Sequence, residues 1–493
     1  MLLYLNHSFH YELENLCRVF YPEEAIRVVR IGSASGKPRG RLRAAAFPVA
    51  VTRVDGVRLT AELVTGRKRL KLARQLPEDT GRAAQELALA QSLFVLLRRA
   101  TGIAPPWGLL TGVRPAKLMR KLRREDGPEE AERYFRESLW VSDEKTALAA
   151  RVAQAEEPVL ALTRPESFSL YVSIPFCPSR CSYCSFVSHT VERPSAKRLI
   201  PAYVERLCGE LRVTAEIAQS LGLRMESVYI GGGTPTTLAP EQMHTLCACL
   251  RDSFDWSHCG EFTVEAGRPD TITDEILAVM REHGANRISI NPQSLNDAVL
   301  ERVGRRHTAS RIFSCFARAR EFQFNSINMD LIAGLPGDTP ESFRASLEGI
   351  IALRPENITV HTLAFKRSAE LMRRPGAREG AEAIRAMLET AGELLLAAGY
   401  SPYYMYRQSR SLGNLENIGW TLPGGHCRYN IDMMEESHTV LACGAGAVTK
   451  LKAPGSSHLE RVFHFKYPYE YLDRFDELLR RKERITAFYR EHT

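Results

Sequence analysis

The chain has 493 residues, of which 44% are hydrophobic and 25% charged, as in folded proteins of two or three domains. No apolar run reaches the eighteen residues of a membrane-spanning helix, and the net charge of +8 is too modest to indicate a nucleic-acid partner. The N-terminus lacks a basic leader, and the eleven cysteines are an odd number. We therefore expect a cytoplasmic protein with reduced thiols, no membrane span and no bound nucleic acid.

Residues 1–160 predict a separate α+β domain whose role stays open. Residues 51–63 alternate apolar and polar side chains around Asp55 and Gly56, a pair typical of a two-residue hairpin. Helical periodicity follows over 82–100 and stops before Gly102. The basic stretch 114–124 predicts a helix with either a solvated face or a site for a polyanion. Two prolines within 156–168 indicate the crossing to the next domain.

Between residues 165 and 400, short β-like runs alternate with amphipathic helical stretches. The predicted strands are 169–174, 226–230, 261–266, 286–290, 327–333 and 357–363, and the predicted helices are 195–220, 240–254, 273–283, 295–321, 339–353 and 380–398. Such alternation favours a parallel sheet, because each parallel connection needs a long crossover. Six units are fewer than the eight of a closed TIM barrel, so we predict an α/β fold with a partial, open (β/α)6 barrel. Its site should lie at the C-terminal ends of the strands.

The alternating pattern ends near residue 400. A predicted strand at the start of 401–493 precedes a Gly- and Asn-rich loop over 413–430, and another strand within 438–451 leads into a glycine turn. We predict a small C-terminal extension over 401–493 that completes a substrate chamber.

Three cysteines lie within eight positions directly after the first barrel strand, in the stretch IPFCPSRCSYCSF. Cys177, Cys181 and Cys184 are enough to hold three irons of a 4Fe-4S cluster. The fourth iron is then open to a small chelator such as the amino and carboxylate groups of S-adenosylmethionine (SAM). A closed zinc site is the alternative, but it needs four ligands, and the next cysteine, Cys208, falls in a predicted helix.

Polar and glycine residues follow the next strands. YIGGGTPT, residues 229–236, ends the second predicted strand with three glycines, which leave room for close approach of a ligand. Glu265, Gln293 and Asp330 come at the ends of the third, fourth and fifth strands. One polar residue at a strand end is often structural, whereas three on one rim predict a lined pocket.

Together these motifs resemble the radical SAM superfamily, whose signature is CxxxCxxC with an aromatic residue, here Tyr183, before the last cysteine. Within it, YVSIPFC, GGGTPT, NPQSLND and DLIAGLPGDT resemble the oxygen-independent coproporphyrinogen III oxidase group over about residues 165–450. The long N-terminal domain, GLLTGVRPAK at 108–117 and CRYNIDMMEE with GAGAV in 427–448 are most similar to HemZ-type coproporphyrinogen dehydrogenases.

The resemblance implies the ligands of the cofactors. Cys177, Cys181 and Cys184 would hold the 4Fe-4S cluster, with SAM on the fourth iron. A second SAM molecule is implied by part of the group. The implied SAM-binding residues are Tyr171, Tyr183, Gly232, Gly233, Thr234, Glu265, Gln293, Arg305, Asp330 and Ala364.

The resemblance also implies a radical SAM oxidoreductase that converts two propionates of coproporphyrinogen III to vinyl groups in haem (porphyrin) biosynthesis. Its implied partners are the tetrapyrrole and a reductant such as flavodoxin or ferredoxin. Phe186 stands where the oxidases carry a further cysteine, and HemW-type haem chaperones carry Phe there too. Those chaperones also carry an HNxxYW motif, where this chain has YNIDMM at 429–434. A haem chaperone without decarboxylase activity is therefore the alternative function.

Two groups of residues give weaker indications. Six basic residues of the barrel loops and the extension offer pairing with substrate carboxylates, with solvated surface as the expected place of most of them: Arg305, Arg306, Lys366, Arg367, Arg407 and Arg410. The cysteines of CAC, residues 247–249, fall in a predicted helix and are expected to pack in the core.

Overall fold

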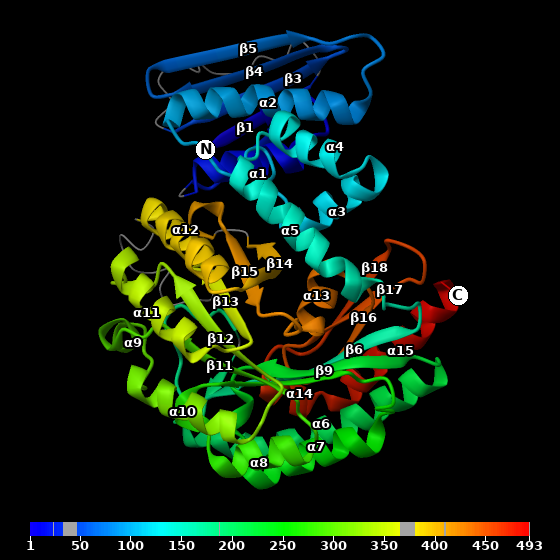
Figure 1. Ribbon diagram of the computed structural model, residues 1–493. Coiled ribbons are helices and arrows are strands. Elements are labelled where there is room, and N and C mark those ends of the chain that lie inside the picture. The colour runs from blue at the N-terminus through cyan, green and yellow to red at the C-terminus, as the bar shows by residue number, and fades with distance from the viewer. Residues whose placement is uncertain (23, 33–46, 187, 365–379, 409–410, 493) are drawn as a thin grey trace. The chain divides into compact units, whose positions relative to one another are not determined.

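A computed structural model describes residues 1–22, 24–32, 47–186, 188–364, 380–408 and 411–492 (Figure 1). The chain divides into two compact units, Met1–Ala150 and Arg151–Thr493. Among the described helices, each is too short or too polar to cross a membrane.

The first unit contains a five-stranded sheet in the order β2-β1-β3-β4-β5. Its strands are β1 (Leu2–Leu5), β2 (Arg27–Arg30), β3 (Val49–Asp55), β4 (Arg58–Thr65) and β5 (Lys68–Gln75). β1 runs parallel to both β2 and β3, and the other pairs are antiparallel. The predicted hairpin is confirmed: β3 and β4 pair around Asp55 and Gly56, and the glycine has the positive φ of 62° that a tight turn requires.

Two helices, α1 (His10–Phe20) and α2 (Arg82–Thr101), form the core of this unit with one face of the sheet. α2 ends at Gly102, whose left-handed conformation lets its N–H donate to the Arg98 carbonyl at 2.8 Å. α3 (Pro115–Glu125) is the predicted basic helix, and α4 (Pro128–Arg133) and a π-helical turn (Tyr134–Ser138) follow it. α5 (Asp143–Leu160) contains Pro158, so the segment expected as an irregular crossing begins inside a helix.

The second unit contains a barrel-like sheet in which the six predicted strands lie side by side and parallel, which confirms the predicted partial barrel (Figure 1). In spatial order they are β6 (Ser167–Ile174), β9 (Arg224–Gly232), β10 (Glu261–Gly267), β11 (Arg287–Gln293), β12 (Ser326–Ala333) and β13 (Asn357–Thr362). Each matches a predicted strand within a few residues. The strands are buried along most of their length, as expected for parallel strands covered by helices.

Helices connect these strands on the outside of the sheet. They are α6 (Pro194–Ser220), α7 (Pro240–Ser253), α8 (Asp274–Glu282), α9 (Asp297–Arg302), α10 (Ala309–Glu321), α11 (Pro340–Leu353) and α12 (Ala381–Ala397). The prediction of a single helix over 295–321 is wrong, because two helices, α9 and α10, occupy this segment. Gly304, with a φ of 81°, ends α9, and the Thr308 side chain accepts from the Arg311 N–H to begin α10. Shorter elements are the pair β7 (Phe176–Cys177) and β8 (His189–Thr190), and 3-10 turns at Pro235–Thr237, Pro269–Thr271 and Leu412–Asn414.

Residues beyond 400 continue the same sheet at both of its edges. β14 (Ser401–Arg407) and β15 (Glu416–Thr421) extend the β13 edge, whereas β16 (Thr439–Cys443), β17 (Val448–Lys452) and β18 (Leu459–Phe463) extend the β6 edge. β16 is parallel to β6. Three helices complete the chain: α13 (Arg428–Glu435), α14 (Pro468–Asp473) and α15 (Phe475–His492). The predicted extension is thus built into the barrel sheet.

Candidate functional site

The cysteine loop leaves β6 at the C-terminal end of the barrel and is held by backbone hydrogen bonds. The short strand β7 brings Cys177 beside Thr190 of β8. The Cys184 N–H donates to the Cys181 carbonyl at 3.1 Å, which forms a turn. The Ser182 N–H reaches the Val303 carbonyl at 3.0 Å, so the loop is tied to the segment between α9 and α10. The three thiols therefore sit on a fixed backbone at the predicted end of the barrel.

Two polar side chains from neighbouring loops contact the cysteine sulfurs. The Thr234 Oγ1 donates to the Cys177 Sγ at 3.5 Å, and the Arg268 Nη1 donates to the Cys181 Sγ at 3.6 Å. Arg268 is only 3% exposed, and Asp270 and the Ser179 hydroxyl fix its guanidinium at 3.1 Å each. A buried cation beside the sulfurs stabilises negative charge on them and on anything that they bind. Sequence reasoning missed Arg268, although it comes directly after strand β10.

The distances between the cysteine sulfurs distinguish a 4Fe-4S cluster from a zinc site. Four sulfurs at about 2.3 Å from one zinc ion lie roughly 3.8 Å apart. Among the described residues, the sets of three candidate ligand atoms within 4.8 Å of one another do not include the loop thiols. A cubic cluster keeps its ligands further apart, because each thiolate binds a different iron. The donor set and its buried cation fit a 4Fe-4S cluster.

Burial governs the protonation of the thiols. It raises the pKa of Cys184 to about 11, and it also raises the pKa of Cys177 despite hydrogen bonds from Ser188 and Thr234. Without a metal, Cys177 and Cys184 are therefore protonated at neutral pH, and metal binding releases their protons.

The glycine loop after β9 packs against the cysteine loop with no space for side chains. A Cβ on Gly233 would lie 2.4 Å from the Phe176 carbonyl oxygen. A Cβ on Gly232, whose φ is 109°, would lie 2.9 Å from the Ser173 hydroxyl. Backbone hydrogen bonds from Gly233 to Ile174 and from Thr234 to Phe176, at 2.8 and 2.7 Å, join the two loops. Glycine is required here by close approach of two backbones.

Glu265 on β10 is a carboxyl group with a shifted pKa. Burial, together with the charge of Asp330, raises its pKa to about 7, although the Tyr229 hydroxyl donates to its Oε1 at 2.6 Å. Tyr229 stacks on Tyr429 of α13 at 4.5 Å between ring centroids, and Tyr171 stacks at 6.3 Å from both. The predicted residue Tyr171 thus belongs to a stack of three tyrosines next to Glu265, and Tyr229 and Tyr429 were not predicted.

Asp330 lies within β12 rather than at its end, because the strand continues to Ala333. Its Oδ1 accepts from the Asn328 Nδ2 at 2.7 Å, and its Oδ2 is 3.6 Å from the His361 Nε2 of β13. Burial favours the neutral acid, but His361 and these hydrogen bonds outweigh it and lower the pKa of Asp330. Asp330 is therefore an ionised carboxylate inside the barrel, near the more easily protonated Glu265.

Gln293 is the last residue of β11 and has a strained backbone. Its φ of 68° lies in the left-handed region, which costs a non-glycine residue about 1 kcal/mol or more. The side chain is 7% exposed, and its Oε1 is buried without a hydrogen bond to the described residues. Strain and an unsatisfied buried acceptor in one residue indicate a position shaped by a ligand.

Arg305 lies in the break between α9 and α10 and is 7% exposed. Its Nε donates to the Tyr183 hydroxyl at 3.2 Å, and its Nη1 donates to the Asn291 carbonyl. Burial disfavours its charge, but Tyr183 and Cys181 raise the pKa of Arg305 overall. The structure therefore brings two predicted residues, Arg305 and Tyr183, together beside the cysteine loop.

The remaining candidates do not form one group. Ala364 makes an isolated antiparallel bridge with Ser411 next to the segment 365–379, and Lys366, Arg367 and Arg410 lie outside the described residues. Arg306 is exposed and paired with Glu192. Arg407 is 3% exposed and so is not among those at the surface, and its Nε donates to the Asn414 carbonyl at 3.2 Å.

Comparisons with known proteins identify the family of the chain. Residues 171–350 match the radical SAM superfamily. The chain is 39% identical over 388 residues to the oxygen-independent coproporphyrinogen-III oxidase-like protein HemZ of Bacillus subtilis, which covers 77% of each chain. It is 30% identical over 305 residues to the heme chaperone HemW of Lactococcus lactis, covering 60% of this chain and 73% of that one.

A solved structure, the coproporphyrinogen III oxidase HemN of Escherichia coli, matches with a TM-score of 0.53 and 24% identity over 66% of this chain and 73% of that chain. This likeness shows a shared fold. The cofactors of the superfamily, a 4Fe-4S cluster and SAM, are those that the cysteine loop and its surroundings fit. The chain belongs to the radical SAM superfamily and, within it, to the oxygen-independent coproporphyrinogen III oxidase group that includes HemZ.

Proposed function

We propose that this protein catalyses the oxygen-independent oxidative decarboxylation of coproporphyrinogen III to protoporphyrinogen IX in the cytoplasm. The proposal rests on the length of the alignment with HemZ. Its 388 aligned residues are more than the second unit contains, so the likeness includes part of Met1–Ala150. The likeness to HemW covers a smaller share of the chain, 60%.

The site residues support this chemistry in separate ways. Bound SAM, when reduced through the cluster, supplies a carbon-centred radical that removes a hydrogen atom. Cys177, Cys181 and Cys184 would hold the cluster, and the buried cation of Arg268 would stabilise its negative charge. The guanidinium of Arg305 can donate hydrogen bonds to the carboxylate of SAM, and the carboxyl group of Glu265 can accept one from an ammonium or hydroxyl group.

The reaction requires more than the radical. Each propionate that becomes a vinyl group loses a hydrogen atom, carbon dioxide and one electron, so an electron acceptor must take part. A protein reductant such as flavodoxin or ferredoxin would deliver the electron that starts each turnover. We place the tetrapyrrole in the barrel, in a chamber completed by the extension that carries Tyr429.

Anaerobic turnover tests the proposal directly. The reconstituted full chain is incubated with coproporphyrinogen III, SAM and a reductant, and the products are separated as oxidised porphyrins. We expect protoporphyrin and 5′-deoxyadenosine from the native chain and neither from Cys181→Ala. Cys259→Ala, which changes a cysteine outside the loop, serves as the matched control. Cleavage of SAM with an unchanged tetrapyrrole would refute the substrate assignment.

A haem chaperone is the second candidate, favoured by Phe186. This side chain directly follows the cysteine loop and is 61% exposed, so a ligand bound beside the loop could contact its ring. A chaperone would bind haem in a fixed ratio without turnover, and Phe186→Ala would weaken that binding several-fold. Absorption titration with haem measures the ratio. Turnover of coproporphyrinogen III without haem binding would exclude this candidate.

A further inference from the structure

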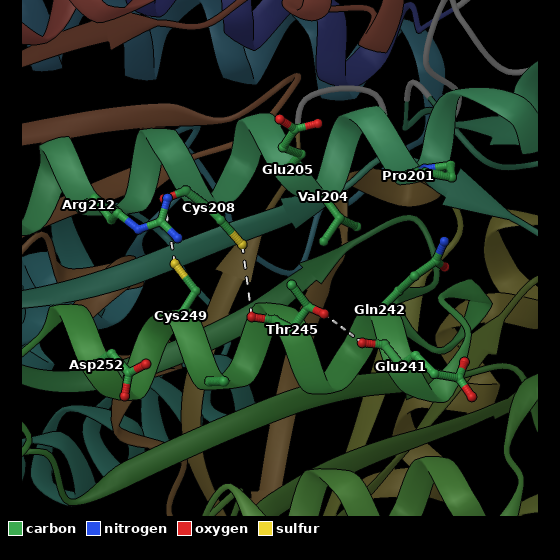
Figure 2. A pocket seen from close by; sticks show the side chains of 11 residues that line it. Pro201, Val204, Glu205, Cys208, Arg212, Glu241, Gln242, Thr245, Cys249 and Asp252 are labelled. Carbon is green, nitrogen blue, oxygen red and sulfur yellow. Dashed lines mark hydrogen bonds between the residues drawn. The ribbon is translucent and has the colours of Figure 1, made fainter.

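A groove on the outside of the barrel brings two thiols together. It lies between α6 and α7, has a volume of about 500 Å³, and is lined by Cys208 of α6 and Cys249 of α7 (Figure 2). Cys249 was expected to pack in the core with Cys247. Cys247 is fully buried, whereas Cys249 is 7% exposed and faces the groove. The function described above uses neither groove cysteine.

Each thiol reaches the backbone of the opposite helix. The Cys249 Sγ donates to the Cys208 carbonyl oxygen at 3.5 Å, and the Cys208 Sγ donates to the Thr245 carbonyl oxygen at 3.9 Å. Thr245 is one turn before Cys249 on α7, and both thiol side chains lie in the space between the two helices (Figure 2). These reciprocal thiol-to-backbone contacts bring the two helices together at Cys208 and Cys249, and a disulfide needs such close approach of two backbones.

We propose that Cys208 and Cys249 form a reversible disulfide that links α6 to α7 by exchange with small-molecule disulfides. The Cys249 thiolate attacks one sulfur of the small disulfide, which forms a mixed disulfide and releases one thiol. The Cys208 thiol then loses its proton and displaces the second thiol. Two protein thiols and one small disulfide thus give one protein disulfide and two small thiols.

The residues around the two thiols determine which cysteine attacks the small disulfide and which resolves the mixed disulfide. The neighbouring Cys208 side chain and, to a smaller extent, Ser253 and Arg212 lower the pKa of Cys249 to about 6, against opposition from burial and Asp252. The same pairing raises the pKa of Cys208. The other charged residues that line the groove are Glu205 and Glu241. Cys249 is therefore the attacking thiolate at neutral pH, and Cys208 is the resolving thiol.

Peptide mapping of the full chain tests the link. The anaerobic protein, with its cluster intact, is incubated with glutathione disulfide, blocked with an alkylating agent and digested with trypsin without reduction. We expect residues 207–212 joined to residues 225–251, with the link lost on reduction. Cys249→Ser and Cys208→Ser should both abolish it. Cys247→Ala, on the same peptide as Cys249, is the matched control and should retain it.

Two results would overturn the inference. One is glutathione that stays on Cys249 without closure in the native chain. The other is a link that survives in Cys249→Ser, which would assign it to Cys247. Because these measurements need no substrate, their failure would leave the proposed function untouched.

The rate of alkylation provides a second readout. In the native chain, the rate at Cys249 should rise with pH through a midpoint near 6. In Cys208→Ala the side chain that stabilises the thiolate is removed, so the midpoint should move up by about one pH unit and the rate at pH 6.5 should fall several-fold. An unchanged profile in Cys208→Ala, with native circular dichroism, would contradict the assigned roles.

Discussion

Glu265 and its partners show how one buried residue links the site to pH. Its pKa of about 7 means that the folded barrel holds a proton that the unfolded chain, with a pKa near 4.5, has already lost. The stability of the cofactor-free protein should therefore fall as pH rises from about 4.5 to 7, by up to about 3 kcal/mol, and stay level above 7. In Glu265→Gln this decline should disappear. Thermal unfolding between pH 5 and 8 measures it, and equal slopes in both proteins would contradict the shifted pKa.

Arg268 should set the reduction potential of the cluster. Its guanidinium contacts the Cys181 sulfur and is nearly excluded from water. Removal of this charge in Arg268→Gln destabilises the reduced, more negative cluster, so the potential should become more negative by about 60 mV, equivalent to about 1.4 kcal/mol. A redox titration followed by electron paramagnetic resonance measures the shift. Arg306→Gln removes an exposed charge and should leave the potential unchanged.

Replacement of Gln293 should change the stability of the protein and its affinity for SAM in opposite directions. In Gln293→Gly the left-handed backbone is no longer strained, so the free energy of unfolding should rise by about 0.5–1 kcal/mol. The same change removes the buried amide, and we expect SAM affinity to fall several-fold. Chemical denaturation and equilibrium dialysis give the two values. Unchanged SAM binding would exclude Gln293 as a contact.

At the scale of elements, the site depends on two loops that share backbone contacts. In Gly233→Ala the new methyl group would overlap the Phe176 carbonyl, so the glycine and cysteine loops must separate. We expect the reconstituted variant to retain several-fold less iron per chain. Gly260→Ala is the matched control, since a Cβ there meets no atom within 4 Å. Equal iron content in the two variants would show that the two loops can separate without loss of the cluster.

The break between α9 and α10 shows what an amphipathic pattern leaves undecided. The apolar period of 295–321 continues through Gly304, so the pattern predicts one helix. The positive φ of Gly304 and the cap at Thr308 end it and restart it. The short segment between them carries Arg305 to Tyr183. A functional residue was thus placed by the interruption of a regular element.

At the scale of the whole molecule, a buried ion pair joins the last helix to the barrel. Lys482 of α15 and Glu210 of α6 are 2.9 Å apart and at most 1% exposed. Glu210 also accepts from the Gly444 N–H at 2.8 Å and the Tyr471 hydroxyl at 2.7 Å. In Lys482→Met the carboxylate loses its counter-charge, and we expect a loss of about 3–5 kcal/mol in stability. Urea denaturation measures it, and Glu210→Gln in the same chain should restore part of the loss. No recovery would show that packing, rather than charge, is the cause.

The net charge is also distributed at this scale. Residues 1–150 carry 26 Lys and Arg against 17 Asp and Glu, whereas the rest of the chain carries 40 against 41. The whole excess of positive charge therefore belongs to the first unit. A composition of +8 over the full length hides this, because it sums two units of different charge.

Local patterns in the sequence were sufficient for the architecture and for the position of the cysteine loop. Hydrophobic period, glycine turns and the spacing of Cys177, Cys181 and Cys184 depend on neighbours in the chain, and they predicted the six parallel strands and the cysteine loop. The tertiary structure decided which distant side chains surround them. Arg268 meets Cys181 across 87 positions, and Cys249 meets Cys208 across 41. Such contacts arise from packing of whole elements, and no local period encodes them.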